Sequence, residues 1–169
     1  MRRSISLLLI ELILASALLI ACDFSSKTRE PSKMIIDDSW IVRVIDVETR
    51  GSLTTKTQVK QYDGSMKDVD YDNEPSAGNI YCLINMSISK TAAGGSSFEW
   101  ERLHIIGDDG MSYNRIEDIF LSNHGYDRLP GTDLQIGDNN GWICFELPQD
   151  VKVQKLIYET DDTQAEIEL

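Results

Sequence analysis

Apolar and polar residues alternate along most of the chain beyond residue 36, which is the period of a β-strand with one buried face. Trp40–Val47 is rich in β-branched residues and is predicted to be the first strand. Asn79–Ser89 alternates more strictly, and its even-numbered residues, Ile80 to Ile88, should face the core. Because a helical period is almost absent, the pattern predicts an all-β domain.

Turn residues divide the next part of the chain into short elements. Phe98–Ile106 and Met111–Arg115 flank Gly107–Gly110, whose Asp-Gly pair suits the tight turn of a hairpin. Ile116–Ser122 is expected to form one or two helical turns, and the chain should leave them near Gly125.

Leu129-Pro130-Gly131 is expected to break the chain. The segments after it are interpreted, in order, as a short strand, a turn, an alternating strand and a last strand: Leu134–Ile136, Gly137–Gly141, Trp142–Leu147 and Val151–Glu159. Pro148 cannot continue a central strand, so it should end the third of these. The acidic segment Thr160–Leu169 is expected to fray.

The polar segment Ser52–Pro75 is long for a connection between strands. It could be an irregular loop, or it could hide an extra hairpin with Thr54–Val59 and Lys67–Tyr71 as arms around Asp63-Gly64. The sequence leaves both alternatives open.

About seven short strands separated by turns are typical of two packed sheets. We therefore predict a single antiparallel, immunoglobulin-like β-sandwich over residues 37–160, followed by an acidic C-terminal tail over 161–169. The length of 169 residues fits one domain. The 28 acidic against 16 basic side chains give a net charge of −12, which argues against a nucleic-acid partner.

The first residues have the layout of an export signal. Met1-Arg2-Arg3 is a basic start, and Ile5–Ala21 is apolar apart from three residues, of which Glu11 would cost roughly 2.5–3.5 kcal/mol in a membrane span. Leu19-Ile20-Ala21-Cys22 resembles the bacterial lipobox, which implies cleavage before Cys22 and attachment of lipid to its thiol. Ordinary secretion and a retained signal anchor are the alternatives.

The lipobox resemblance predicts a signal peptide over 1–21 and a lipidated cysteine with a flexible tether over 22–36. Two or three acyl chains on one cysteine anchor a protein stably, whereas one chain does so only marginally. We therefore expect a cell-membrane lipoprotein, held at the extracytoplasmic face through Cys22.

The strand segments also resemble a known family. Gly78–Ser89, the hairpin Ile105–Tyr113, Gly141–Pro148 and Leu156–Tyr158 are similar, in order and spacing, to telokin-like immunoglobulin-fold domains found on bacterial lipoproteins. The resemblance covers about Asp37–Glu159 and implies the fold. That family has no known function, so the resemblance carries over no catalytic residue.

Cys82 and Cys144 invite a disulfide in an exported domain. Side-chain alternation argues against the bridge, because Cys82 falls on the apolar face of its strand while Cys144 shares a face with Trp142 and Glu146. The pairing remains open.

No metal or catalytic motif is complete. Asp68–Glu74 places carboxylates at alternate positions as a calcium loop does, but the glycine at the sixth position and the glutamate at the twelfth are missing. His104 and His124 lack a zinc spacing, and nucleophile and phosphate-loop motifs are absent from the sequence. We predict no cofactor and no enzyme activity.

Two functions remain: an interaction module that binds a protein, peptide or glycan through loops or an edge strand, and a structural or accessory subunit of a transporter or envelope complex. Trp40, Trp100 and Trp142 are candidate contact residues for the first. Trp100 is the best surface candidate, because charged residues surround it.

Overall fold

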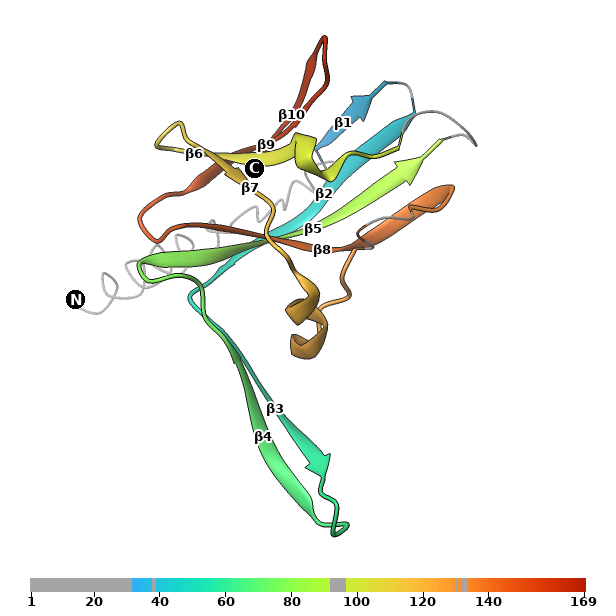
Figure 1. Cartoon of the computed structure of the whole chain (residues 1–169). Helices are drawn as coiled ribbons and strands as arrows, with labels where there is room; N and C mark the ends of the chain where they lie inside the picture. Colours follow the sequence, from blue (N-terminus) through green and yellow to red (C-terminus); the bar gives the residue numbers. More distant parts are fainter. Residues whose placement is uncertain (1–31, 38, 92–96, 130, 132–133) are drawn as a thin grey trace, which may run out of the picture. The chain divides into compact units, whose positions relative to one another are not determined.

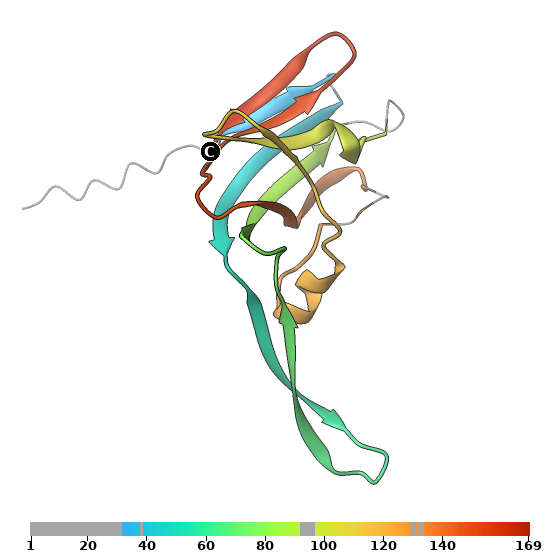
Figure 2. The same ribbon diagram turned by 60° about the vertical axis from the view of Figure 1, so that its left-hand side comes forward.

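The strands of the chain form antiparallel sheets, two of which pack face to face as a sandwich (Figures 1 and 2). The computed structural model describes residues 32–37, 39–91, 97–129, 131 and 134–169. The first sheet has the order β1-β2-β5-β8, with β1 Lys33–Ile36, β2 Trp40–Arg50, β5 Asn79–Lys90 and β8 Gly137–Pro148. The second has the order β10-β9-β6-β7, with β10 Gln164–Glu168, β9 Val153–Glu159, β6 Leu103–Gly107 and β7 Ser112–Asn114. The predicted all-β sandwich is confirmed.

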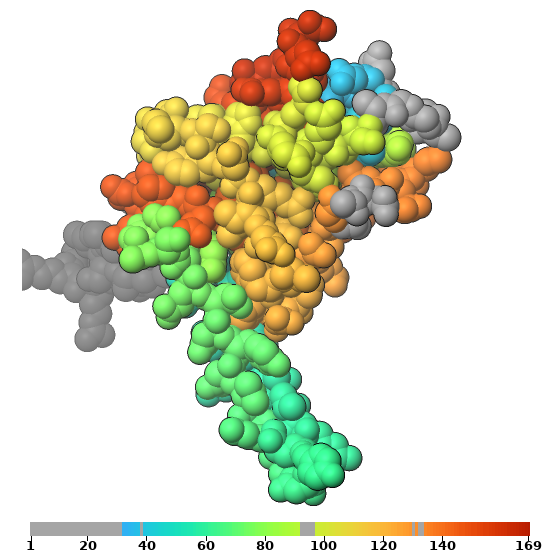
Figure 3. All heavy atoms as spheres, in the orientation of Figure 1, coloured from blue at the N-terminus to red at the C-terminus, as the bar shows by residue number. Residues whose placement is uncertain are grey.

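A third, two-stranded sheet consists of β3 Leu53–Lys60 and β4 Met66–Asn73. It is the extra hairpin that the sequence left open, and Gly64 in its turn takes the positive φ of 84°. The hairpin and the sandwich belong to one compact unit, Pro31–Leu169. Within it, the hairpin continues from β2 and leads back into β5, and in the space-filling view it stands clear of the sandwich (Figure 3).

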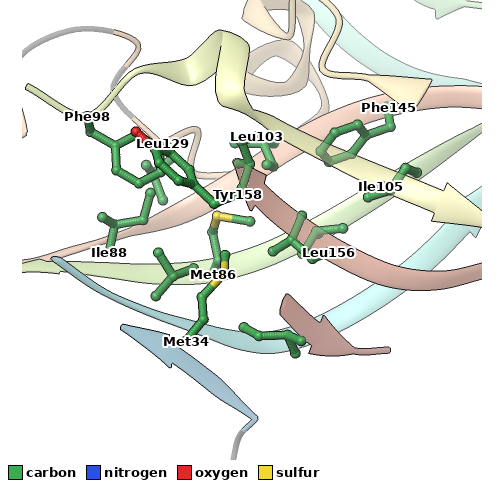
Figure 4. Close-up of a cluster of buried hydrophobic side chains, with 14 of the residues drawn as sticks. Met34, Met86, Ile88, Phe98, Leu103, Ile105, Leu129, Phe145, Leu156 and Tyr158 are labelled. Carbon is green, nitrogen blue, oxygen red and sulfur yellow. The ribbon is translucent and has the colours of Figure 1, made fainter. Parts of the chain in front are cut away.

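The main core lies between the two four-stranded sheets, and it contains the even-numbered face of β5 as predicted. Cys82, Ile84, Met86 and Ile88 are all fully buried. Figure 4 shows part of this core, with labelled side chains from both sheets and the loops beside them: Met34, Met86, Ile88, Phe98, Leu103, Ile105, Leu129, Phe145, Leu156 and Tyr158. The close packing of these side chains is the main source of the sandwich's stability.

The odd-numbered face of β5 is buried as well, in a second and smaller core on the other side of the same sheet. The described residues include two 3₁₀ helices, η1 Trp100–Arg102 and η2 Ile119–His124, and Leu121 of η2 belongs to this second core. The predicted helical turns are confirmed for Ile119–Ser122, whereas residues 116–118 are not helical; η2 continues to His124, and Gly125 ends it with a φ of 79°. None of the helices among the described residues is long and apolar enough to cross a membrane.

The predicted boundaries were wrong at both ends of the sandwich. Lys33–Ile36 was assigned to the tether but forms β1, in which Met34 and Ile36 are buried. The acidic tail 161–169 was expected to fray, yet Gln164–Glu168 forms β10 on the edge of the second sheet. Lys155 on β9 holds it with ion pairs to Glu166 and Glu168, at 3.1 and 3.0 Å.

The prediction between Leu134 and Gly141 was also wrong. Leu134–Ile136 is not a strand, and the expected turn Gly137–Gly141 is the first part of β8, paired with Met86–Ser89. The buried Asn139 side chain donates to the carbonyl oxygens of Ile88 and Gln135 at 3.1 and 2.8 Å, so this turn-forming residue stabilises a strand instead. Gly141 is needed for close approach, because an added Cβ would lie 2.5 Å from the Leu129 nitrogen.

The predicted hairpin Phe98–Arg115 is confirmed from Leu103 onward. β6 and β7 pair around the turn at Gly107–Gly110, where Gly110 has a φ of 76°. Phe98–Arg102 does not extend β6, because η1 occupies its last three residues. This 3₁₀ turn lets the ring of Trp100 meet the core residue Phe98 edge to face, with the ring centroids 4.8 Å apart.

Candidate functional site

The β3–β4 hairpin is the most exposed regular element that the structure describes. Eight residue pairs hold it together, from Leu53 opposite Asn73 to Lys60 opposite Met66. At the strand rise of about 3.4 Å per residue this ladder is roughly 25 Å long. Most residues of both strands are exposed, so the hairpin presents two faces and two edges to solvent.

The two faces of the hairpin differ in chemistry. The even-numbered face is charged, with Lys56 opposite Asp70 and with Gln58 donating to Asp68 at 2.9 Å. The odd-numbered face carries mostly threonine, valine and tyrosine, for example Thr57 opposite Val69. Beyond the root of the hairpin, this weakly polar face covers no core.

Large apolar side chains are exposed toward the tip of the hairpin. Tyr62 in the turn is fully exposed, Met66 is 56% exposed and Val59 is 37% exposed. Asp63 fixes the turn between them, since its carboxylate accepts hydrogen bonds from the backbone N–H and hydroxyl of Ser65. The tip therefore offers an aromatic ring, a thioether and an aliphatic side chain on an ordered turn, which is the side-chain chemistry of a protein contact.

The root of the hairpin is embedded in the second core. Leu53, the first residue of β3, is 6% exposed and packs with Tyr81, Leu83, Leu121 and Cys144. Partly buried residues of η2 and the loop after it complete the cluster, and two ring pairs join it to the sheet: Tyr81 with Phe120 at 5.3 Å and Tyr126 with Trp142 at 5.1 Å. The hairpin thus projects from a packed base.

His124, at the end of η2, ties the two strands of the hairpin to that base. Its Nδ1 lies 2.8 Å from the Thr55 hydroxyl on β3, and its Nε2 lies 2.9 Å from Asn73 Oδ1 on β4. In a neutral ring, Nε2–H donates to the amide oxygen and Nδ1 accepts from the hydroxyl. Sequence reasoning missed this clamp, because its three residues are far apart in the chain and have no common motif.

Glu146 on β8 fastens the segment that returns from the hairpin to β5. Its carboxylate accepts from the Ser76 backbone N–H at 2.9 Å and from Asn79 Nδ2 at 2.8 Å. Hydrogen bonds from Ser76 and then Asn79 lower the pKa of Glu146 below its ordinary value. The carboxylate therefore stays charged at neutral pH and fixes the direction in which β4 leaves the sandwich.

Asp118 is the most buried carboxyl group of this region, at 1% exposure. It accepts from Arg115 at 3.0 and 2.7 Å and from Arg128 at 3.1 Å. Its backbone oxygen accepts from Leu121, so the charged network also positions the start of η2. Both oxygens of the Asp118 carboxylate therefore accept hydrogen bonds from arginines that hold the fold.

The tryptophans that the sequence proposed as contact residues are mostly internal. Trp40 is 2% exposed in the main core, and Trp142 packs on the second core. Trp100, the preferred surface candidate, is half-buried against the main core, and the Arg115 guanidinium covers its ring at 4.1 Å. None of the three belongs to the hairpin.

The cysteines and histidines of the described part of the chain do not converge on a metal or redox centre. Cys82 and Cys144 are free and lie in different cores on opposite faces of the sheet, as their alternation predicted. His104 is buried in β6 with Nε2 3.7 Å from Glu159, while His124 is used at the hairpin base. Within the described residues there is no group of three possible ligands placed to hold a metal ion.

Asp68–Glu74 is not a loop, because its first six residues are the main part of β4. The three aspartates that suggested calcium point to the same side of a strand, about 7 Å apart at successive alternate positions. Cys22 lies outside the described residues, as do the predicted signal peptide and most of the tether.

Comparison with known proteins adds one structure of similar fold. The solved structure of an uncharacterized β-sandwich protein from Clostridium difficile 630 aligns with 79% of this chain and 87% of its own, at 15% sequence identity and a TM-score of 0.41. No protein-family model matches the chain, and no curated protein matches it either.

Proposed function

We propose that this protein is a lipid-anchored extracytoplasmic lipoprotein whose β-sandwich is an interaction module, and that the β3–β4 hairpin makes the contact with a partner protein. The exposed apolar tip on a hairpin with a fixed base is the observation that carries the proposal. An ordered hairpin loses less conformational entropy on binding than a flexible loop of the same length.

The anchoring part of the proposal rests on the sequence of residues 1–22. The basic start, the apolar run and Leu19-Ile20-Ala21-Cys22 stand in the order that export and lipidation need. We also propose that the sandwich belongs with the telokin-like immunoglobulin-fold domains of bacterial lipoproteins. In support, the segments that carry this resemblance coincide with β5, β6–β7, β8 and β9.

Lipidation is tested with the full chain expressed in a bacterium fed with labelled fatty acid. The wild type should incorporate label and fractionate with membranes, whereas Cys22→Ser should do neither, because the thiol that carries the lipid is gone. Ser26→Ala, a change of similar size in the predicted tether, is the matched control and should behave as the wild type. Labelling and membrane retention of Cys22→Ser would contradict the anchor.

The interaction is tested by capturing partners from the envelope with the full chain and comparing two pairs of variants. Tyr62→Ser and Met66→Ser remove the exposed side chains of the tip and should reduce the recovery of a captured protein. Met111→Ser and Ile119→Ser remove apolar side chains that lie outside the hairpin tip and are 61% exposed each, close to the 56% of Met66, and they should leave recovery unchanged. Equal recovery by all four variants would show that the hairpin tip makes no contact.

A further inference from the structure

We infer that the outer edge of β4 is a strand-addition site for a basic, amphipathic segment of the partner protein. The inference rests on the proposed function and names the chemistry of the partner. The segment would lie extended beside Met66–Asn73 as a third strand of the hairpin sheet.

The first support is the open edge itself. Within the described residues β4 pairs only with β3, so the backbone N–H and C=O groups on its other side have no strand to bond. The outer strands of the sandwich are shorter or partly covered: β1, β7 and β10 have four, three and five residues, and Arg115 and Arg128 bridge to β8. The open edge of β4 is eight residues long and can pair with another strand. A third strand would stabilise the two-stranded sheet.

The second support is the pattern of side chains along that edge. On β4, Asp68, Asp70 and Asp72 share one face, while Val69 and Tyr71 lie on the other. Opposite charges and aromatic or β-branched pairs stabilise adjacent strands. The complementary strand therefore has Lys or Arg at alternate positions and apolar residues between them.

The charge balance of the hairpin selects a basic partner for β4. Across the ladder, the three carboxylates meet only one cation: Lys56 stands opposite Asp70, whereas Gln58 and Thr54 stand opposite the other two. A basic strand on the free side of β4 would complete the neutralisation. The edge of β3 does not attract it in the same way, because β3 carries two lysines and no carboxylate, whereas β4 carries three aspartates and one lysine, Lys67.

The same pattern disfavours a second copy of this chain as the occupant. If two β4 edges paired antiparallel about Asp70, Asp68 of each copy would stand opposite Asp72 of the other. Like charges directly opposite one another destabilise a strand pair. The aspartate row therefore protects the open edge against self-association while it leaves the edge available to a strand of opposite charge.

The test uses the mature lipidated protein, which begins at Cys22, in nonionic detergent, together with synthetic heptapeptides with blocked ends. The first probe alternates Lys and Val, and the second has the same composition with all Lys residues before all Val residues. Two further probes are alternating peptides that carry N-methyl groups on one or the other set of alternate amides. We expect the alternating peptide to bind, to slow hydrogen exchange of amides in β4, and to lose binding when the set of amides that faces β4 is methylated.

Substitution of the aspartate row separates this site from general attraction to an acidic protein. The triple variant Asp68→Asn, Asp70→Asn, Asp72→Asn should raise the dissociation constant roughly threefold to 150-fold, because it removes three cross-strand charge pairs that each contribute about 0.2–1 kcal/mol. Its control, Asp127→Asn, Asp150→Asn, Asp162→Asn, removes equal charge from exposed positions outside the hairpin and should leave binding within twofold.

Equal binding of the alternating and block peptides, or protection of amides outside the hairpin, would overturn the inference. So would no binding of the alternating peptide. These results are independent of the proposed function, because the assay contains no natural partner. If the peptide fails while Tyr62→Ser and Met66→Ser still reduce capture of a protein, the edge site is wrong and the hairpin remains the contact element.

Discussion

His124→Ala should release the hairpin from its base without unfolding the sandwich. The imidazole joins Thr55 on β3 and Asn73 on β4 through two hydrogen bonds of 2.8 and 2.9 Å, and both are partly buried. Each such bond contributes about 0.5–1.5 kcal/mol, so the loss of both should lower the free energy of hairpin opening by about 1–3 kcal/mol. The main core contains no residue of β3 or β4, so the stability of the sandwich should change little.

The assay is hydrogen exchange followed amide by amide. In His124→Ala the amides of β3 and β4 should exchange roughly fivefold to 150-fold faster, while those of β5 and β8 should keep the wild-type rate. Asn123→Ala, at the exposed neighbouring position, is the control and should change neither group. Wild-type exchange in the His124→Ala hairpin, or equal acceleration throughout the sandwich, would refute the clamp.

Four further predictions concern buried groups. Phe145→Ala should lower the free energy of unfolding by about 3–5 kcal/mol in urea denaturation, because the ring is fully buried in the main core; a neutral result would mean that this packing is wrong. Asp118→Ala should cost about 3–5 kcal/mol in the same assay, since it leaves two guanidinium groups without their buried carboxylate, and Asp118→Asn should fall between it and the wild type. Cys82 and Cys144 should both react with a thiol reagent only after unfolding, since burial raises the pKa of Cys82 to about 12 and raises that of Cys144 as well. Because their ordinary pKa is 9.0, the stability due to the neutral thiols is complete below pH 9 and is lost as the pH rises toward 12; a midpoint of urea unfolding that stays constant over that range would contradict this.

Strands with one strictly apolar face could be predicted from the sequence. In Asn79–Ser89 every even-numbered residue is hydrophobic, and a slip of one position would move all of them out of the core, so the alternation fixes the register. The same rule indicates β10, where Ala165 and Ile167 alternate with acidic residues. Its acidic composition suggested a tail, but the negative side chains lie outward and two of them pair with Lys155.

Composition misled where a polar residue acts inside the fold. Asparagine and glycine are typical of turns, yet Asn139 is buried with hydrogen bonds to neighbouring carbonyl oxygens, and Gly141 makes room for the backbone near Leu129. The Asn139 role depends on the pairing of β8 with Ile88 of β5, and the Gly141 role depends on the segment at Leu129, which lies beside β8. A single sequence contains no periodic signal for such a contact.

The candidate site could be predicted only in part. Two polar arms around Asp63-Gly64 indicated the hairpin, because turn chemistry and alternation are local. The clamp at its base was beyond prediction, since His124 meets Thr55 across 69 positions and Asn73 across 51. Only the tertiary structure brings these distant residues together.

The two cores on opposite faces of the β1-β2-β5-β8 sheet explain how the sandwich can present an exposed hairpin without depending on it. Phe145 lies in the first core and Leu53 at the hairpin root lies in the second, while β5 contributes to both. Substitutions in the main core should therefore act on global unfolding, and substitutions at the root should act on opening of the hairpin. His124 and Phe145 share no partner in the described contacts. The double variant His124→Ala, Phe145→Ala should therefore lower the free energy of unfolding by the sum of the changes in the two single variants, within about 0.5 kcal/mol. A larger coupling measured in that cycle would mean that the hairpin is part of the cooperative fold of the sandwich, and that its exposed surface is constrained by stability as well as by binding.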